Sequence, residues 1–227
     1  STETNRRDYR EMLFRSRGMK DNIGGVILFD ETLRQSAQDG TPLVELIKTQ
    51  GALPGIKVDK GLIPLDSSPE ETITQGLNGL DERCKEYFSL GAKFTKWRAV
   101  IKISDSIPSD ECIKANMQAL ARYAKIVQEN HMVPMVEPEV LMDGNHSIER
   151  CYEVSCKTLQ TLFDCLHKEG VDIKGTILKP NMVTSGSLAE NQASIQDVAE
   201  MTVKCLKENV PPDLPGITFL SGGQSDI

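Results

Sequence analysis

Six short apolar segments alternate with amphipathic helical patterns along this chain, and the alternation constrains the fold more than any other feature. Each segment is rich in β-branched or other apolar residues and is bounded by turn formers, which is typical of buried strands. The segments are residues 24–29, 54–61, 94–103, 132–140, 175–182 and 216–220. Helical patterns cover residues 3–17, 41–50, 71–90 (beginning at Glu71 or Leu77), 109–130, 148–168 and 194–209. Such alternation predicts a parallel sheet with right-handed crossovers.

Two architectures fit this pattern, an open doubly wound sheet and a closed barrel. No GxGxxG motif follows the first strand segment, so the dinucleotide-binding form of the open sheet has no local support. Charged residues instead gather at the carboxyl ends of the strand segments, where parallel barrels place their chemistry. We therefore expect an α/β protein with a (β/α)₈ TIM-barrel fold, six of whose strands are visible, and a single domain over residues 1–227.

The composition excludes several classes of protein. A formal net charge of −7 argues against non-specific binding to nucleic acid or anionic membranes. The longest apolar run, residues 26–29, is far too short to span a bilayer. The six cysteines lack CxxC or zinc-like spacing and fall within helical patterns. We expect a cytoplasmic protein with free thiols and no bound metal.

Lys179 is the first candidate for a catalytic residue. It stands where the apolar strand segment Thr176-Ile177-Leu178 ends, and Pro180 follows at once. A charged amine at the end of a buried strand is costly unless it is paired or loses its proton. Lys179 is therefore a candidate nucleophile.

Four successive strand segments each carry two polar residues at positions i and i+2, which share one face of a strand. The pairs are Lys57 with Asp59, Lys96 with Arg98, Glu137 with Glu139, and Lys179 with Asn181. If these faces point inward, four cations meet three anions, and the balance of 4 − 3 = +1 suits an anionic substrate. A purely structural set of ion pairs is the alternative, but a structural barrel layer would consist of branched apolar residues.

The chemistry that these residues could perform follows from their proximity. Like charge from Lys96 and Arg98 would leave Lys179 partly neutral near pH 7. A neutral amine attacks a ketone or an aldehyde and forms a Schiff base. Glu137 and Glu139 could supply the proton donor and acceptor for this reaction.

A short turn, Ser221-Gly222-Gly223, follows the last strand segment. Its exposed backbone N–H groups could hold a phosphate group. Phosphate sites of parallel barrels favour the loops after the last strands, so the position strengthens an otherwise weak motif.

Together these segments resemble the class I, Schiff-base fructose-bisphosphate aldolases of the eukaryotic type. The resemblance covers essentially all 227 residues, and the order of FTKWR, VEPE and LKPNM makes it highly specific. It is carried by GGVILF (24–29), GIKVDKG (55–61), TITQG (72–76), FTKWR (94–98), VPMVEPE (133–139), LKPNMV (178–183) and TFLSGGQS (218–225).

The resemblance implies reversible cleavage of fructose-1,6-bisphosphate to dihydroxyacetone phosphate and glyceraldehyde-3-phosphate, in glycolysis and gluconeogenesis and without a cofactor. Lys179 would form the iminium, and Glu137 would act as general acid and base. Lys96 would stabilise developing charge, and Glu139 would hydrogen-bond within the same cluster. The resemblance also implies a homotetramer, with possible binding to cytoskeletal filaments.

The same resemblance implies two phosphate subsites. Lys57 and Arg98 would face the phosphate at the aldehyde end of the sugar. The turn Ser221-Gly222-Gly223 would hold the phosphate at the dihydroxyacetone end, and Asp59 would be structural or supporting.

Family members carry further strands at both ends, bearing a cleavage aspartate and a phosphate-binding arginine that are absent from these 227 residues. We therefore expect a fragment of a longer chain that alone folds poorly and cleaves sugar slowly or not at all, since an open barrel exposes unpaired edges.

Two other functions remain open at this stage. A different Schiff-base barrel, such as a transaldolase, would act on a monophosphate, but Lys57 and Arg98 beside the glycine turn favour two phosphate subsites. A non-catalytic binding protein is the other alternative, and only activity of the complete chain separates it from an aldolase.

Overall fold

The computed structural model describes residues 2–220. Six parallel strands form one sheet in the order β1-β2-β5-β6-β7-β8. They are β1 (Gly25–Leu28), β2 (Leu53–Lys57), β5 (Phe94–Ile101), β6 (Val133–Val140), β7 (Ile177–Leu178) and β8 (Gly216–Ile217). Each predicted strand segment contains one of these strands, so the parallel α/β class is confirmed.

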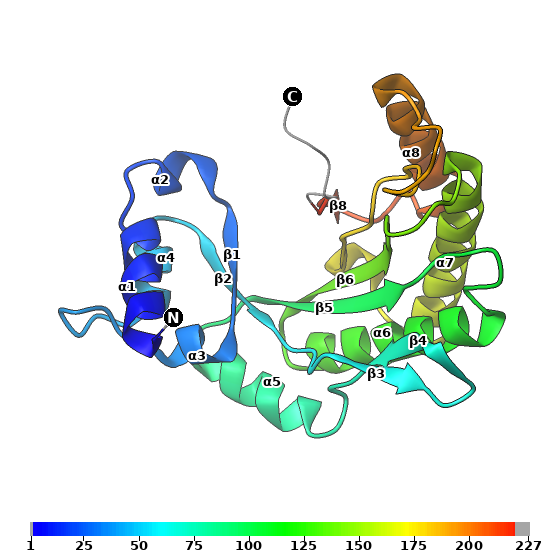
Figure 1. The fold of residues 1–227 in the computed structure, drawn as a ribbon. Coiled ribbons are helices and arrows are strands. Elements are labelled where there is room, and N and C mark those ends of the chain that lie inside the picture. The colour runs from blue at the N-terminus through cyan, green and yellow to red at the C-terminus, as the bar shows by residue number, and fades with distance from the viewer. Residues whose placement is uncertain (1, 221–227) are drawn as a thin grey trace.

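The order of the strands separates the two expected architectures. Neighbours in the sheet follow one another along the chain, leaving aside a separate hairpin, and every pair is parallel. A doubly wound sheet would reverse its strand order at a switch point. The strand order is therefore that of a barrel, and the sheet curls with helices along its outer side (Figure 1).

The helices occupy the predicted intervals with small differences at their ends. They are α1 (Glu3–Phe14), α2 (Met19–Asn22), α3 (Asp30–Arg34), α4 (Leu43–Thr49), α5 (Leu80–Ser89), α6 (Asp110–Glu129), α7 (Ile148–Lys168) and α8 (Ile195–Asn209), with a 3₁₀ turn at Ile173–Gly175. Ser109 caps α6 by accepting a hydrogen bond from the Cys112 N–H. Ser194 and Asp197 form a capping box at the start of α8.

The segment before α5 differs from the prediction. Residues 62–74 form an antiparallel hairpin of β3 (Leu62–Leu65) and β4 (Ser68–Thr74), so a helix beginning at Glu71 was wrong. The buried Glu71 carboxylate accepts hydrogen bonds from the backbone N–H and the hydroxyl of Ser109. The helix begins only at Leu80, after Gly79 with its φ of 65°.

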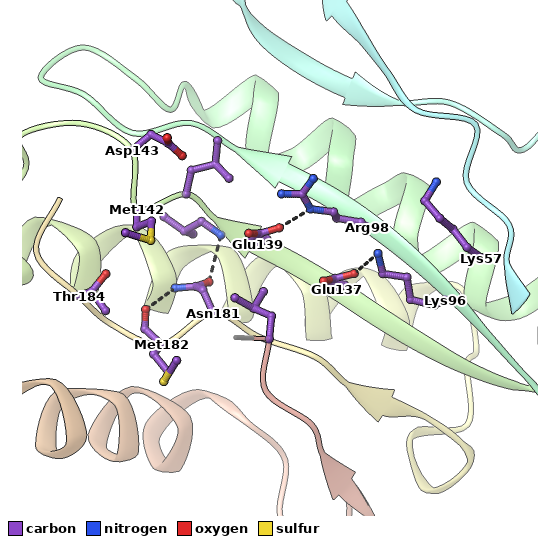
Figure 2. Close-up of a pocket in the computed structure, with 13 residues that line it drawn as sticks. Lys57, Lys96, Arg98, Glu137, Glu139, Met142, Asp143, Asn181, Met182 and Thr184 are labelled. Atoms are coloured by element: carbon purple, nitrogen blue, oxygen red, sulfur yellow. Dashed lines mark hydrogen bonds and ion pairs between the residues drawn. The ribbon is translucent and has the colours of Figure 1, made fainter. Parts of the chain in front are cut away.

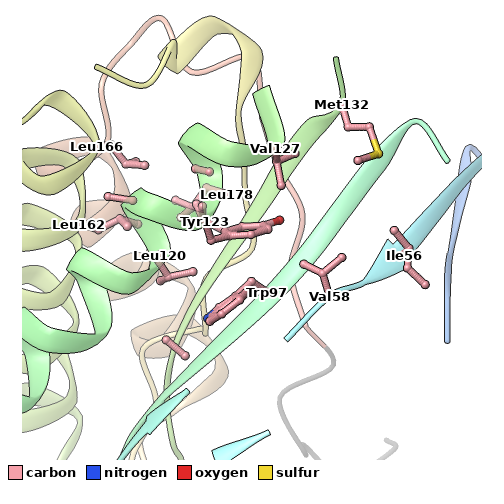
Figure 3. Close-up of a cluster of buried hydrophobic side chains, with 14 of the residues drawn as sticks. Ile56, Val58, Trp97, Leu120, Tyr123, Val127, Met132, Leu162, Leu166 and Leu178 are labelled. Atoms are coloured by element: carbon pink, nitrogen blue, oxygen red, sulfur yellow. The ribbon is translucent and has the colours of Figure 1, made fainter. Parts of the chain in front are cut away.

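The core fixes which face of β5 is available for chemistry. Trp97 is fully buried, and its ring centroid lies 5.3 Å from that of Tyr123 on α6 (Figure 3). The Thr95 hydroxyl is 2.6 Å from the Tyr123 hydroxyl. Because side chains alternate along a strand, Thr95 and Trp97 facing α6 turn Lys96 and Arg98 to the opposite face.

Two further properties of the described residues bear on the sequence predictions. Within residues 2–220 no helix is both long and apolar enough to cross a membrane. All six cysteines are free thiols, and all lie in helices α5 to α8, as predicted.

Candidate active site

The register of three adjacent strands brings the charged side chains to one level. Arg98 on β5 is in register with Glu137 on β6. Leu178 on β7 is in register with Val136, so Lys179, the next residue, comes beside Glu137. Its N–H donates to the Val136 carbonyl at 2.8 Å, which extends the ladder past the end of β7.

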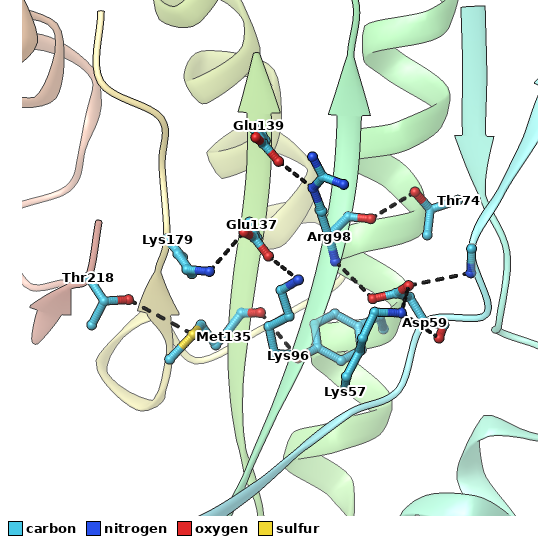
Figure 4. Close-up of polar contacts among 12 residues, drawn as sticks. Lys57, Asp59, Thr74, Lys96, Arg98, Met135, Glu137, Glu139, Lys179 and Thr218 are labelled. Atoms are coloured by element: carbon cyan, nitrogen blue, oxygen red, sulfur yellow. Dashed lines mark hydrogen bonds and ion pairs between the residues drawn. The ribbon is translucent and has the colours of Figure 1, made fainter. Parts of the chain in front are cut away.

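Glu137 is the centre of the site. Its side chain is only 3% exposed, and each oxygen faces an ammonium (Figure 4). Oε1 lies 2.9 Å from the Nζ of Lys179, and Oε2 lies 2.5 Å from the Nζ of Lys96. A buried carboxylate is costly without such partners. The sequence placed these three residues together correctly, and the structure shows that one carboxylate serves both amines.

A second group of charges continues the cluster toward β2. The Nζ of Lys57 lies 2.5 Å from Oδ1 of Asp59, whose side chain is buried. The other Asp59 oxygen accepts from the backbone N–H of Arg98 at 3.3 Å. The Arg98 guanidinium pairs with Glu139 on β6. Asp59 therefore ties the loop after β2 to β5.

The lysines of this cluster are shifted toward their neutral forms. Burial lowers the pKa of Lys179 below its usual 10.5, Glu139 opposes this effect, and Arg98 adds to it. Burial also lowers the pKa of Lys96, to about 8. The direction for Lys179 agrees with the sequence argument, but the main cause is loss of solvent rather than like charge.

An open cavity of about 530 Å³ adjoins these residues (Figure 2). Its lining includes Lys57, Lys96, Arg98, Glu137 and Glu139, with Leu141, Met142, Asp143, Asn181 and Thr184 among the others. Lys179 does not line the cavity itself, but its amine contacts Glu137 in the wall.

The loop that follows β6, residues 141–143, and Thr184 were not singled out from the sequence. The signal that could have found them is their position, since they follow the carboxyl ends of strands β6 and β7.

Asn181, predicted to share a face with Lys179, has a structural role instead. Its Oδ1 accepts from the Val140 N–H at 3.0 Å, and its Nδ2 donates to the Ser155 hydroxyl at 3.1 Å. These bonds join the segment after Lys179 to β6 and α7. The predicted phosphate turn, Ser221-Gly222-Gly223, lies outside the described residues.

The arrangement as a whole suits condensation of an amine with a carbonyl group. A lysine with a lowered pKa is a nucleophile, and a carboxylate within hydrogen-bond distance can move its protons. Lys57, Lys96 and Arg98 give the cavity wall positive charge that attracts an anionic substrate. Within residues 2–220, no group of three or more histidine, cysteine or acidic side chains is arranged to hold a metal ion.

Comparison with known proteins agrees with this chemistry. The family model described as "Glycolytic: Fructose-bisphosphate aldolase class-I" matches residues 1–227. The chain belongs to the class-I fructose-bisphosphate aldolase family. Members of this family are lyases, and the family predicted from the sequence is confirmed.

Individual aldolases match over nearly the whole chain. A probable class 1 fructose-bisphosphate aldolase of Xanthomonas axonopodis pv. citri is 58% identical over 99% of this chain and 67% of its own length. Fructose-bisphosphate aldolase C of Carassius auratus is 51% identical over 100% of this chain and 62% of its own length. The resemblance therefore extends beyond aldolases of eukaryotes.

A solved structure shows the same fold. It is titled a ternary co-crystal structure of fructose-bisphosphate aldolase from Plasmodium falciparum in complex with TRAP and a small molecule inhibitor. It matches with a TM-score of 0.96 and 49% identity over 98% of this chain and 65% of its own chain. The chain thus spans about two thirds of the length of the aldolases it matches.

Proposed function

We propose that the complete protein catalyses the reversible aldol cleavage of fructose-1,6-bisphosphate to dihydroxyacetone phosphate and glyceraldehyde-3-phosphate, as a step of glycolysis and gluconeogenesis. Lys179 is the nucleophile. The observation that carries the proposal is the 2.9 Å contact between its Nζ and Glu137, at the wall of a cavity rich in cations. Membership of the aldolase family supports the substrate.

The reaction begins when the neutral amine of Lys179 attacks the ketose carbonyl. The proton released from nitrogen passes to Glu137, whose Oε1 already faces that nitrogen. Glu137 then protonates the carbinolamine hydroxyl, which leaves as water, and the iminium forms. Lys96, on the other Glu137 oxygen, stabilises the developing negative charge, and Glu139 holds Arg98 in place.

Lys57 and Arg98 are proposed to bind the phosphate at the aldehyde end of the sugar. Both line the cavity, and each is balanced by one carboxylate, Asp59 or Glu139. An incoming phosphate would share these cations with the carboxylates rather than displace bulk water alone. Ser221, Gly222 and Gly223 are proposed to bind the other phosphate.

The remaining proposals concern the whole protein. We propose a single barrel domain over residues 1–227 that needs no cofactor and works in the cytoplasm as part of a homotetramer. A relative in Arabidopsis thaliana, 50% identical over 63% of its own length, is named a cytosolic aldolase, which supports the location. The solved Plasmodium falciparum aldolase carries a second component named TRAP in its title, and this supports the possibility of further partners, with cytoskeletal filaments as one proposal.

Trapping with borohydride tests the proposal. The complete protein is incubated with dihydroxyacetone phosphate, reduced and digested, and the added mass is located by mass spectrometry. We expect the label on Lys179 and its loss in Lys179→Met. The matched control Lys174→Met, which removes an exposed lysine five residues away, should keep the label.

Two results would contradict the proposal. A folded protein with no label on Lys179 would show that its amine is not the nucleophile. Turnover of fructose-6-phosphate in preference to the bisphosphate would instead favour a transaldolase-like reaction.

A further inference from the structure

We propose that Cys156 on α7 and Cys205 on α8 form an oxidisable dithiol, which a peroxide converts into a disulfide between the two helices. The Sγ atoms lie 3.4 Å apart, and the Cys156 thiol donates to Cys205. A disulfide requires about 2.05 Å, so the sulfur atoms need to approach by roughly 1.4 Å. Within residues 2–220 this is the one hydrogen bond found between two sulfur atoms.

The two cysteines lie in an interface that already holds the helices together. Tyr152 and Gln160 stand one turn before and one turn after Cys156, on the same face of α7. The Tyr152 hydroxyl donates to the Glu208 carboxylate, and the Gln160 amide donates to Asn209 at 2.7 Å. The side chains that flank the thiols therefore fix the register of α7 against α8.

The two thiols differ in a way that suits successive steps. Cys156 is partly exposed, whereas Cys205 is 2% exposed. Burial and the hydrogen bond from Cys156 raise the pKa of Cys205, so that its thiol keeps its proton. The peroxide therefore reaches Cys156 first, and Cys205 is the resolving thiol.

The reaction balances with one molecule of hydrogen peroxide. The Cys156 thiolate attacks one peroxide oxygen, the O–O bond breaks, and a sulfenic acid and hydroxide form. The Cys205 sulfur then attacks the Cys156 sulfur, and the S–O bond breaks. The leaving hydroxide takes the Cys205 proton and becomes water. Two thiols and one peroxide thus give one disulfide and two water molecules.

The dithiol lies directly behind the segment that follows Lys179. Ser155, the neighbour of Cys156, accepts a hydrogen bond from Asn181 at 3.1 Å. Thr202, one turn before Cys205, accepts from the Val183 N–H at 2.9 Å. Helices α7 and α8 therefore hold residues 181–183 between them.

A small cavity of about 10 Å³ leaves room at this junction, and its lining includes Ser155, Pro180, Thr202 and Cys205. Drawing the two helices together would move the partners of Asn181 and Val183. We therefore expect oxidation to lower turnover several-fold, a consequence that rests on the function proposed for Lys179.

Disulfide mapping in the complete protein tests the bond. The protein is treated with hydrogen peroxide, alkylated and digested with trypsin without reduction. The expected link joins the peptides 151–157 and 205–207, with a loss of two free thiols per chain. Because Cys151 lies on the first peptide too, Cys151→Ser is the matched control.

We expect the link to disappear in Cys156→Ser and in Cys205→Ala and to remain in Cys151→Ser. A link that persists in Cys156→Ser, or oxidation that adds oxygen without joining the two peptides, would overturn the proposal. The mass measurement does not depend on aldolase activity, so it separates this inference from the proposed function.

Turnover before and after oxidation tests the coupling to the active site. The cross-linked protein should regain full activity with dithiothreitol, and Cys156→Ser should be insensitive to the peroxide. Unchanged turnover in fully cross-linked protein would overturn the coupling.

Discussion

The Oε1 atom of Glu137 lies 2.9 Å from the Nζ of Lys179 while its Oε2 atom lies 2.5 Å from the Nζ of Lys96. One buried carboxylate is thus shared by two amines whose pKa values are both lowered by burial. The shared carboxylate keeps the nucleophile within reach of a proton acceptor, and it holds the second lysine where charge develops on oxygen.

Replacing Glu137 by Gln should slow the chemistry without removing the nucleophile. The amide keeps the shape but cannot take a proton from Lys179, and general acid–base catalysis typically contributes about 10²- to 10⁴-fold. We expect cleavage and borohydride labelling of Lys179 to slow by factors in this range, measured by rapid quench. Circular dichroism should be unchanged. Labelling at the normal rate would show that another group moves the proton.

Glu139→Gln should shift the pH dependence of Schiff-base formation to lower pH. Glu139 raises the pKa of Lys179, and its removal also leaves the positive charge of Arg98 uncompensated. Both effects favour the neutral amine, so the fraction of reactive Lys179 at a given pH should increase. The rate of borohydride labelling between pH 6 and about 10 measures this. A shift to higher pH would contradict the electrostatic assignment.

Much of the site could be predicted because its side chains lie within strands. Lys96 with Arg98, and Glu137 with Glu139, occupy alternate positions of long apolar segments, and the period of two fixes that each pair shares a face. The carboxyl ends of parallel strands then meet at one edge. No packing detail is needed for either step.

The pairing between strands could not be predicted in the same way. Which carboxylate faces Lys179 depends on the register of β6 with β7, which the packing of the whole sheet decides. The role of Asp59 was missed because it follows β2, and one of its partners is the backbone N–H of Arg98. The hairpin of residues 62–74 was missed because its apolar residues also fit a helical start.

Lys57→Met should weaken binding of the bisphosphate selectively. The loss of one charged contact to a phosphate costs about 1.5–3 kcal/mol, or roughly 10- to 150-fold in kcat/KM. Fructose-1-phosphate lacks the second phosphate, so its kcat/KM should change little. Lys60→Met, which removes an exposed lysine nearby, is the matched control. Equal losses with both sugars would place Lys57 in the chemistry rather than in the phosphate subsite.

Gly55→Ala should destabilise the sheet beneath the site. Gly55 on β2 is in register with Phe94 on β5, and an added Cβ would lie 2.3–2.5 Å from the Phe94 ring. The ring cannot retreat toward β1, because it also lies 3.1 Å from the position of a Cβ on Gly25. Overpacking of this kind costs about 1–3 kcal/mol.

The free energy of unfolding in urea, measured on the complete protein, checks this last prediction. Gly24→Ala is the control, since its Cβ would meet nothing within 4 Å. That substitution should be neutral or slightly stabilising, because alanine restricts the unfolded chain. Gly55→Ala combined with Phe94→Leu should recover part of the loss, because the smaller side chain makes room for the methyl group. Equal stability of the two single variants would show that the strands adjust freely, and that close packing of Gly55 on Phe94 does not hold β2 and Lys57 in place.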